Sequence, residues 1–144
     1  MVLRALIDES DDPGLRESSR ALVHRRMAPP FRVSHLVVGE AFAGIAKARR
    51  GRDIDPMWHF EQLLHRSRRI EIVGVPRDHG IAYHRCVLRL HGSEAWLEPN
   101  DASILGVACI DPDCSTFYTT DIVMLESDGL LGVAREYGTD IMEL

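Results

Sequence analysis

Long hydrophobic runs, an apolar leader and cysteines at metal-binding spacing are all missing from this sequence. No apolar run approaches the roughly 20 residues of a membrane-spanning helix, so no membrane association is expected. The N-terminal stretch MVLRALIDESDD turns acidic too early for a secretory signal. The three cysteines, Cys86, Cys109 and Cys114, are an odd number without zinc-type spacing. They predict reduced thiols in a cytoplasmic protein.

Basic residues are scarce in the C-terminal part of the chain. Residues 92–144 contain 1 basic residue against 11 acidic ones, a net charge of −10. Residues 1–91 contain 16 basic and 11 acidic residues, a net charge of +5, and together the two parts give the formal −5 of the chain. Two interpretations stay open: solvated faces that differ in charge, or a basic flank for a polyanion beside a carboxylate-rich pocket for a cation.

The remaining composition is that of one globular domain, with 45% hydrophobic and 27% charged residues over 144 positions. Periodicity and turn residues predict strands within 31–34, 69–75, 115–121 and 139–144. The predicted helices cover 11–27, 35–50, 57–67, 77–92, 97–108 and 129–138, and Gly138 is the predicted stop of the last one. Strands separated by helices predict a single α/β domain over residues 1–144, with a mostly parallel sheet covered on both faces.

Two of the predicted helices have a recognisable apolar side. Ser34 is placed to cap the helix over 35–50, in which Val37, Ala41 and Ile45 form one stripe with Val38 and Phe42 beside it. In the helix over 77–92, the apolar side is expected to contain Ile81, His84, Val87 and Leu88.

Three carboxylates are expected to meet at one edge of the sheet, because ligands of parallel sheets bind outside the carboxyl ends of the strands. Asp121 closes the strand FYTTD, and Glu40 lies early in the helix that follows the strand at 31–34. Asp101 precedes Ile104, Leu105 and Ala108 at helical spacing, which places it on the buried side of its helix.

Converging carboxylates repel, since a like-charged pair at ~4 Å costs on the order of 4 kcal/mol at an effective dielectric constant of ~20. Mg²⁺ or Mn²⁺ relieves this repulsion in an all-oxygen site and can activate a water molecule for phosphodiester hydrolysis. A simpler interpretation also stays open for each residue: Asp101 and Asp121 as helix or turn caps, and Glu40 as a solvent-facing side chain.

Three segments, FRVSHLVVGEAFAGIAK, LEPNDASILGVA and FYTTD, resemble the PIN-domain ribonucleases in order and spacing, above all the VapC-type toxins of toxin–antitoxin modules. Glu40 matches the family's second acidic motif. Pro99, Asp101, Ala102 and Ile104 match its third motif, and Thr119 and Asp121 match its fourth. The resemblance covers nearly the whole chain. It implies a three-layer α/β/α sandwich, Mg²⁺- or Mn²⁺-dependent endoribonuclease activity, dimerisation and inhibition by an antitoxin protein.

The family's first motif, an Asp that ends strand 1, has two possible alignments. Asp8 ends the apolar stretch VLRALID and would be that ligand in the first alignment. In the second, this stretch matches the short helix that follows the family's first Asp, because Leu3, Leu6 and Ile7 fit a helical stripe while Arg4 suits a central strand poorly. The second alignment predicts a fold without its first strand and first metal ligand.

Applied residue by residue, the resemblance makes Glu40, Asp101 and Asp121 the catalytic metal ligands, with Asp8 in the first alignment. Thr119 would steady the strand end and Asn100 would orient the site. Arg49, Arg50 and Arg52 form the best basic cluster for RNA, and a solvated helix end is the alternative. A PIN-like protein that binds RNA or a partner without catalysis is the second hypothesis. A phospho-acceptor receiver domain fits worse, because it would need a lysine later in the chain, and the single lysine, Lys47, lies within the helix predicted over 35–50.

Overall fold

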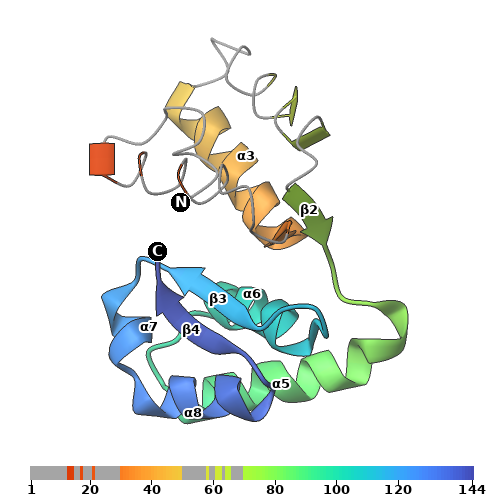
Figure 1. Cartoon of the computed structure of the whole chain (residues 1–144), viewed down its shortest axis with the longest axis vertical. Coiled ribbons are helices and arrows are strands. Elements are labelled where there is room, and N and C mark those ends of the chain that lie inside the picture. The colour runs from red at the N-terminus through yellow and green to blue at the C-terminus, as the bar shows by residue number, and fades with distance from the viewer. Residues whose placement is uncertain are drawn as a thin grey trace. The chain divides into compact units, whose positions relative to one another are not determined.

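The computed structural model describes residues 13–14, 17, 21, 30–49, 58, 61–62, 64–65 and 70–144 (Figure 1). The chain divides into two compact units, Met1–Val73 and Gly74–Leu144. The helices predicted over 11–27 and 57–67 fall largely outside the described residues. Those of their residues that the structure describes are helical.

The first unit contains a parallel strand pair and one long helix. Strand β1 (Phe31–Ser34) pairs with β2 (Ile70–Val73) in the register Phe31↔Ile70. Helix α3 (His35–Arg49) follows β1 directly. The Ser34 hydroxyl accepts a hydrogen bond from the backbone N–H of Leu36 at 3.2 Å, so the predicted cap is confirmed.

The predicted apolar stripe of α3 is confirmed for the side chains that the structure describes. Ala41 and Ile70 are buried together, and Val33, Val37, Val38, Phe42 and Leu64 pack against them. The helix therefore covers one side of its own strand pair, as expected for a β–α–β segment.

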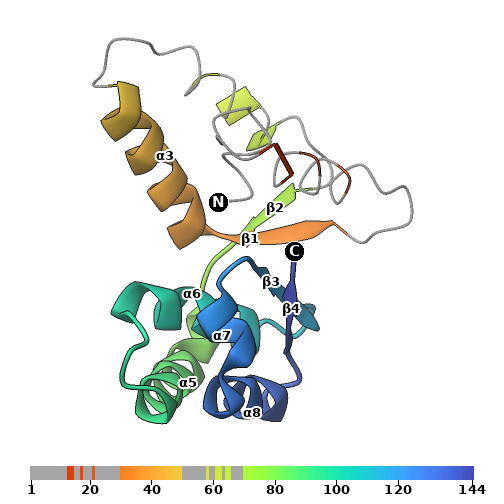
Figure 2. The same cartoon turned by 90° about the vertical axis from the view of Figure 1, so that its left-hand side faces the viewer.

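The second unit contains four α-helices and a second parallel strand pair (Figures 1 and 2). Its elements are η1 (Arg77–His79), α5 (Gly80–Ser93), α6 (Pro99–Ile110), β3 (Thr116–Thr119), α7 (Ile122–Glu126), α8 (Asp128–Glu136) and β4 (Asp140–Glu143). Strand β3 pairs with β4 in the register Phe117↔Ile141 and Tyr118↔Met142. The predicted strands and helices of this part are confirmed, while α7 is an addition that the pattern did not indicate.

One hydrophobic core holds the second unit together. It contains Cys86, Leu90, Leu97, Ala102, Leu105, Cys109, Met124, Leu130, Ala134 and Ile141. Helix α6 contributes most to this core because it is apolar on nearly every side, and α5 packs along it. In both views α5 and α8 also lie side by side (Figures 1 and 2).

The predicted apolar side of α5 is correct at Val87, which packs against the core, and wrong at its other positions. Ile81 is 72% exposed and Leu88 is 71% exposed, whereas Cys86 and Leu90 are fully buried. The stripe is displaced around the helix because Cys86 and Leu90 belong to the core of the second unit, while Val87 lies against Gly106 of α6. A thiol had not been counted as a core residue, although free cysteine is among the most buried residue types.

The two ends of α8 are fixed by local hydrogen bonds. The Ser127 hydroxyl accepts from the backbone N–H of Leu130 at 3.0 Å and caps the first turn. At the other end, Gly138 adopts a φ of 81°, and the N–H of Thr139 returns to the carbonyl of Ala134 at 3.1 Å. This left-handed turn favours glycine and confirms Gly138 as the predicted stop.

The architecture is mixed α/β, and both strand pairs are parallel as predicted. Within the described residues the strands form two two-stranded sheets, one in each unit. Of the helices within the described ranges, none has the length and apolar character needed to cross a bilayer.

Candidate metal centre

Asp101 lies in the first turn of α6, which places its carboxylate beside the core. Pro99 occupies the first helical position, where its missing N–H costs no hydrogen bond. Asp101 follows two residues later and is half-buried, with Ile104 and Leu105 buried on the same side of the helix. The residue before the helix is Glu98, whose side chain makes no cap hydrogen bond. The interpretation of Asp101 as the helix cap is therefore wrong.

Asp121 lies two residues after the end of β3 and is held in a tight turn. Its backbone N–H donates to the Thr119 hydroxyl at 3.1 Å. Its own Oδ1 accepts from the N–H of Val123 at 2.9 Å, so that Asp121 caps α7. The prediction that Asp121 caps the next turn is confirmed. The hydrogen bond to Thr119 is compatible with its predicted supporting role, which stays a prediction. The cap uses one carboxylate oxygen and leaves Oδ2 for another partner.

The charged groups that shift the pKa of Asp101 are both acidic. Partial burial raises the pKa of Asp101, and the negative charges of Asp121 and Glu98 raise it further. No cation is among the groups that shift this pKa. The end of β3 and the start of α6 therefore bring two predicted ligands, Asp101 and Asp121, within electrostatic reach of each other, in a place that favours a bound cation.

Glu98 is an acidic neighbour that the motif comparison did not single out. It is exposed and immediately precedes α6. The sequence does contain a signal for Glu98, because the residue before a helix and the residues of its first turn lie at the same end of that helix. Their charges therefore share one electrostatic environment. The motif that Asp101 matches starts at Pro99 and therefore does not include Glu98.

The other predicted site residues lie elsewhere or outside the described residues. Glu40 is exposed on α3, in the first unit, and its convergence with Asp101 and Asp121 stays a prediction. Asn100 is exposed next to Asp101 on α6. The remaining predicted residues, or their side chains, lie outside the described residues: Asp8, Arg49, Arg50 and Arg52.

The residues present fit a Mg²⁺ or Mn²⁺ site of the open kind. Among the residues described, no three acidic, histidine or cysteine side chains form a closed cage. Mg²⁺ does not require one, because it keeps several water molecules and binds through one or two carboxylates together with substrate phosphate. The two carboxylates are hard oxygen donors, and the raised pKa of Asp101 reflects a local excess of negative charge that a divalent cation would relieve.

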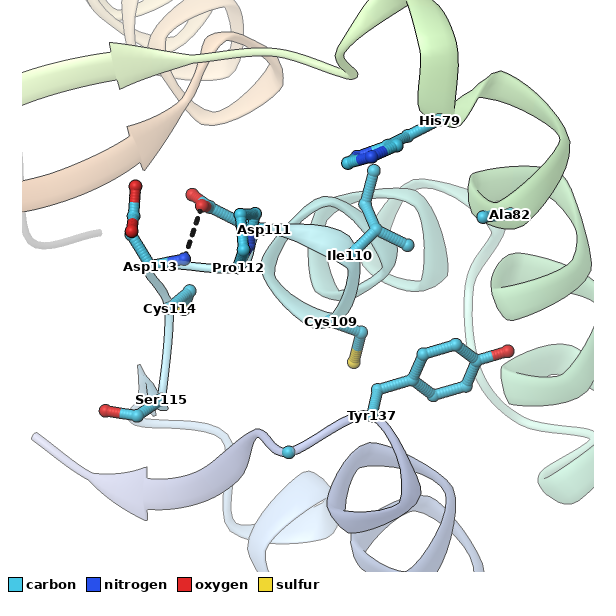
Figure 3. A pocket seen from close by; sticks show the side chains of 11 residues that line it. His79, Ala82, Cys109, Ile110, Asp111, Pro112, Asp113, Cys114, Ser115 and Tyr137 are labelled. Carbon is cyan, nitrogen blue, oxygen red and sulfur yellow. Dashed lines mark hydrogen bonds between the residues drawn. The ribbon is translucent and has the colours of Figure 1, made fainter.

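The opposite end of α6 borders an open hollow of about 490 Å³ (Figure 3). It is lined by His79, Ala82, residues 109–115, Tyr137 and Gly138. Asp111 ends α6, and its Oδ1 accepts from the N–H of Asp113 at 3.1 Å, which shapes the rim as a turn. Neither Asp101 nor Asp121 lines this hollow, so it is distinct from the acidic pair.

No family model, curated protein or solved structure matches the chain. The assignment of function therefore rests on the residues and their geometry.

Proposed function

We propose that this protein is a metal-dependent endoribonuclease of the PIN type that acts as the toxin of a toxin–antitoxin pair. The observation that supports the proposal best is the like-charged pair Asp101 and Asp121, at the start of α6 and the end of β3. The family resemblance predicts metal ligands at these two positions. The pair lies on a mixed α/β frame with parallel strands, which is compatible with the proposed three-layer sandwich.

The roles of the side chains follow from their places. Asp101 and Asp121 would hold one Mg²⁺ or Mn²⁺ ion, with Glu40 joining them in the complete site, and Asp8 in the first alignment. When bound, the ion would supply a water molecule of lowered pKa and charge stabilisation at a phosphodiester oxygen. The Thr119 hydroxyl holds Asp121 by accepting a hydrogen bond from its backbone N–H. Asn100 is adjacent to Asp101 in α6 and would orient the site.

The predicted partners follow from the same proposal. An RNA strand would approach the acidic pair through its bound cation, and the cluster Arg49, Arg50 and Arg52 would contact its phosphates. A cognate antitoxin protein, a homodimeric state and a cytoplasmic location belong to the proposal as well. The second hypothesis, a PIN-like protein that binds RNA or a protein without cutting, differs from the first only in catalysis.

The deciding experiment is an RNA cleavage assay with purified full-length chain. Unstructured and structured RNA are incubated with Mg²⁺ or with EDTA, and products are separated on a denaturing gel. We expect cleavage in Mg²⁺, none in EDTA, and a loss of at least a hundredfold in Asp101→Asn. This substitution keeps the size of the side chain but removes a charged ligand.

A matched variant shows whether a loss of cleavage is specific to Asp101 or follows from the removal of any surface carboxylate. Asp78→Asn removes the same charge from an exposed position in η1 and should cleave like the wild type. Equal cleavage by the wild type and Asp101→Asn would refute the proposed site. RNA binding without cleavage in any metal would favour the second hypothesis.

A further inference from the structure

Four exposed apolar side chains lie at the carboxyl end of the β3–β4 strand pair, close to Asp121 in the chain or in the strand register. They are Tyr118, Ile122, Val123 and Met142, and each of them is at least 40% exposed. The second unit, which the structure describes throughout, has seven large hydrophobic side chains of such exposure, and four of the seven lie at this end. Such a concentration is typical of an interaction surface, whereas single exposed apolar residues need no explanation. We call these four side chains the apolar rim.

The pleat of the strand pair directs two members of the rim away from the core. Tyr118 and Met142 are register partners in the parallel pair, so their side chains point to the same face of it. The preceding partners, Phe117 and Ile141, pack in the core of the second unit and therefore point to the opposite face. Tyr118 and Met142 thus leave an aromatic ring and a thioether partly exposed on the face that lies away from the core.

The other two members of the rim are held next to Asp121 by the start of α7. Ile122 is the first residue of α7, and Val123 donates its backbone N–H to Oδ1 of Asp121 at 2.9 Å. Met124, one residue further, is buried in the core, so α7 is anchored on that side while Ile122 and Val123 stay exposed. The rim therefore borders a proposed metal ligand directly. The cap that orients the Asp121 carboxylate also fixes the place of the rim.

The charges around the rim limit what can bind there. Residues 74–144 contain 12 acidic and 4 basic residues, and Glu98, Asp101 and Asp121 are among the acidic ones. Such a field repels a phosphate group except where a bound cation neutralises it. An RNA strand would therefore place a phosphate on the cation, and the rim would be left for an uncharged part of the same strand. A nucleobase is such a part, because every base has a π face that stacks on aromatic side chains.

We propose that the apolar rim holds an unpaired nucleobase of the RNA strand whose phosphate lies on the cation at Asp101 and Asp121. This inference rests on the proposed function and adds to it the residues that distinguish unpaired from paired RNA. In a duplex each base is paired and stacked between its neighbours, so its face is not available to a protein side chain. Tyr118 supplies an aromatic face for stacking, and Ile122 and Val123 supply apolar contact beside the bound phosphate.

The first test leaves the protein unchanged. Fluorescence anisotropy compares the binding of two labelled, unstructured RNA strands of equal length to the full-length chain. One strand has all its bases, and the other has abasic ribose at every internal position, so both carry the same phosphates. Ca²⁺ replaces Mg²⁺ as the hard cation during the titration, and a denaturing gel checks that the strands stay intact. We expect the complete strand to bind about tenfold more tightly than the abasic strand or more, and a duplex of the same sequence to bind more weakly than the single strand.

Matched substitutions then locate the contact. Tyr118→Ser and Ile122→Ser should each weaken the binding of single-stranded RNA by about threefold to tenfold. Ile81→Ser makes the same change at an exposed position of α5 and should bind RNA like the wild type. Mn²⁺ binding should be the same in all three variants, because none of them removes a carboxylate. Circular dichroism checks that each variant is folded.

The results separate this inference from the proposed nuclease activity. Equal affinity of the wild type for the complete and the abasic strand would overturn the inference, whatever the cleavage assay shows. Unchanged RNA binding in both rim variants would overturn it as well, and a smaller oligomer in Ile122→Ser would then identify the rim as a protein contact. Base-dependent binding through the rim without cleavage in any metal would support the inference and refute the nuclease.

Discussion

Gly106 of α6 lies against Val87 and Tyr83 of α5, and a single methyl group there should disturb the packing that positions Asp101. A Cβ atom built on Gly106 would lie 2.7 Å from Cγ2 of Val87 and 3.3 Å from Cε2 of Tyr83. The first distance is far shorter than a van der Waals contact. Val87 cannot move aside easily, because a β-branched side chain in a helix has one strongly preferred rotamer.

The expected cost of Gly106→Ala follows from two opposing effects. Overpacking of a well-filled core costs about 1–3 kcal/mol. Replacing glycine by alanine inside a helix gains about 0.5–1 kcal/mol through helix propensity. The clash is the larger effect, so the free energy of unfolding should fall by about 1–2 kcal/mol.

Urea unfolding followed by circular dichroism measures this difference, with Gly132→Ala as the matched control. Gly132 lies in α8 and has no atom within 4 Å of the position of an added Cβ. The control should therefore be stabilised by about 0.5–1 kcal/mol. If both variants were stabilised equally, the close packing of α5 on α6 at Gly106 would be refuted.

Three further substitutions test the core, the cap and the charge cluster by the same measurement. Leu105→Ala removes a fully buried side chain and should cost about 2–5 kcal/mol; a loss below that range would mean that the site is not in the core. Ser127→Ala removes the cap that accepts from Leu130 and a hydrogen bond to the Glu94 carboxylate, and should cost about 1–2 kcal/mol; an unchanged midpoint would contradict the cap. Asp101→Asn should stabilise the metal-free protein at neutral pH, because the raised pKa means that the folded state disfavours the charged carboxylate. That gain should fade as the pH falls toward 3.8, the ordinary value for Asp, where the wild-type carboxyl is protonated as well; a gain that grows toward low pH would contradict the raised pKa.

Local signals in the sequence predicted most of the second unit. Pro99 and the apolar residues after it indicated α6, and Gly138 indicated the end of α8, because both act through the backbone of their own segment. Helix α7 was missed for the opposite reason. It is only 5 residues long and depends on the cap that Asp121 provides, so it offers almost no periodicity to detect.

The apolar side of α5 could not be read from residue types alone. The sequence offers two overlapping stripes, one through Ile81 and Leu88 and one through Cys86 and Leu90. Only the packing of α5 against α6 decides between them, since an isolated helix has no preferred face. The exposed stripe contains Ile81 and Leu88, which are both larger than Cys86, and residue size therefore favours the wrong side of the helix.

The candidate site was predicted in part, because its residues come from separate segments. The strand end at Asp121 and the helix start at Asp101 were each recognisable locally, and the structure brings the two charges together. The contribution of Glu98 depends on how the chain enters α6, which no short motif encodes. The place of Glu40 depends on long-range packing rather than on local pattern.

Every step of the proposed activity depends on the joint binding of one divalent cation by Asp101 and Asp121. Titration of the purified chain with Mn²⁺, followed by electron paramagnetic resonance of the free ion, measures that binding without any need for RNA. We expect one bound Mn²⁺ per chain for the wild type and for Asp78→Asn, displaced by Mg²⁺ and lost in both Asp101→Asn and Asp121→Asn. Unchanged Mn²⁺ binding in the Asp101 and Asp121 variants, or none in the wild type, would contradict it.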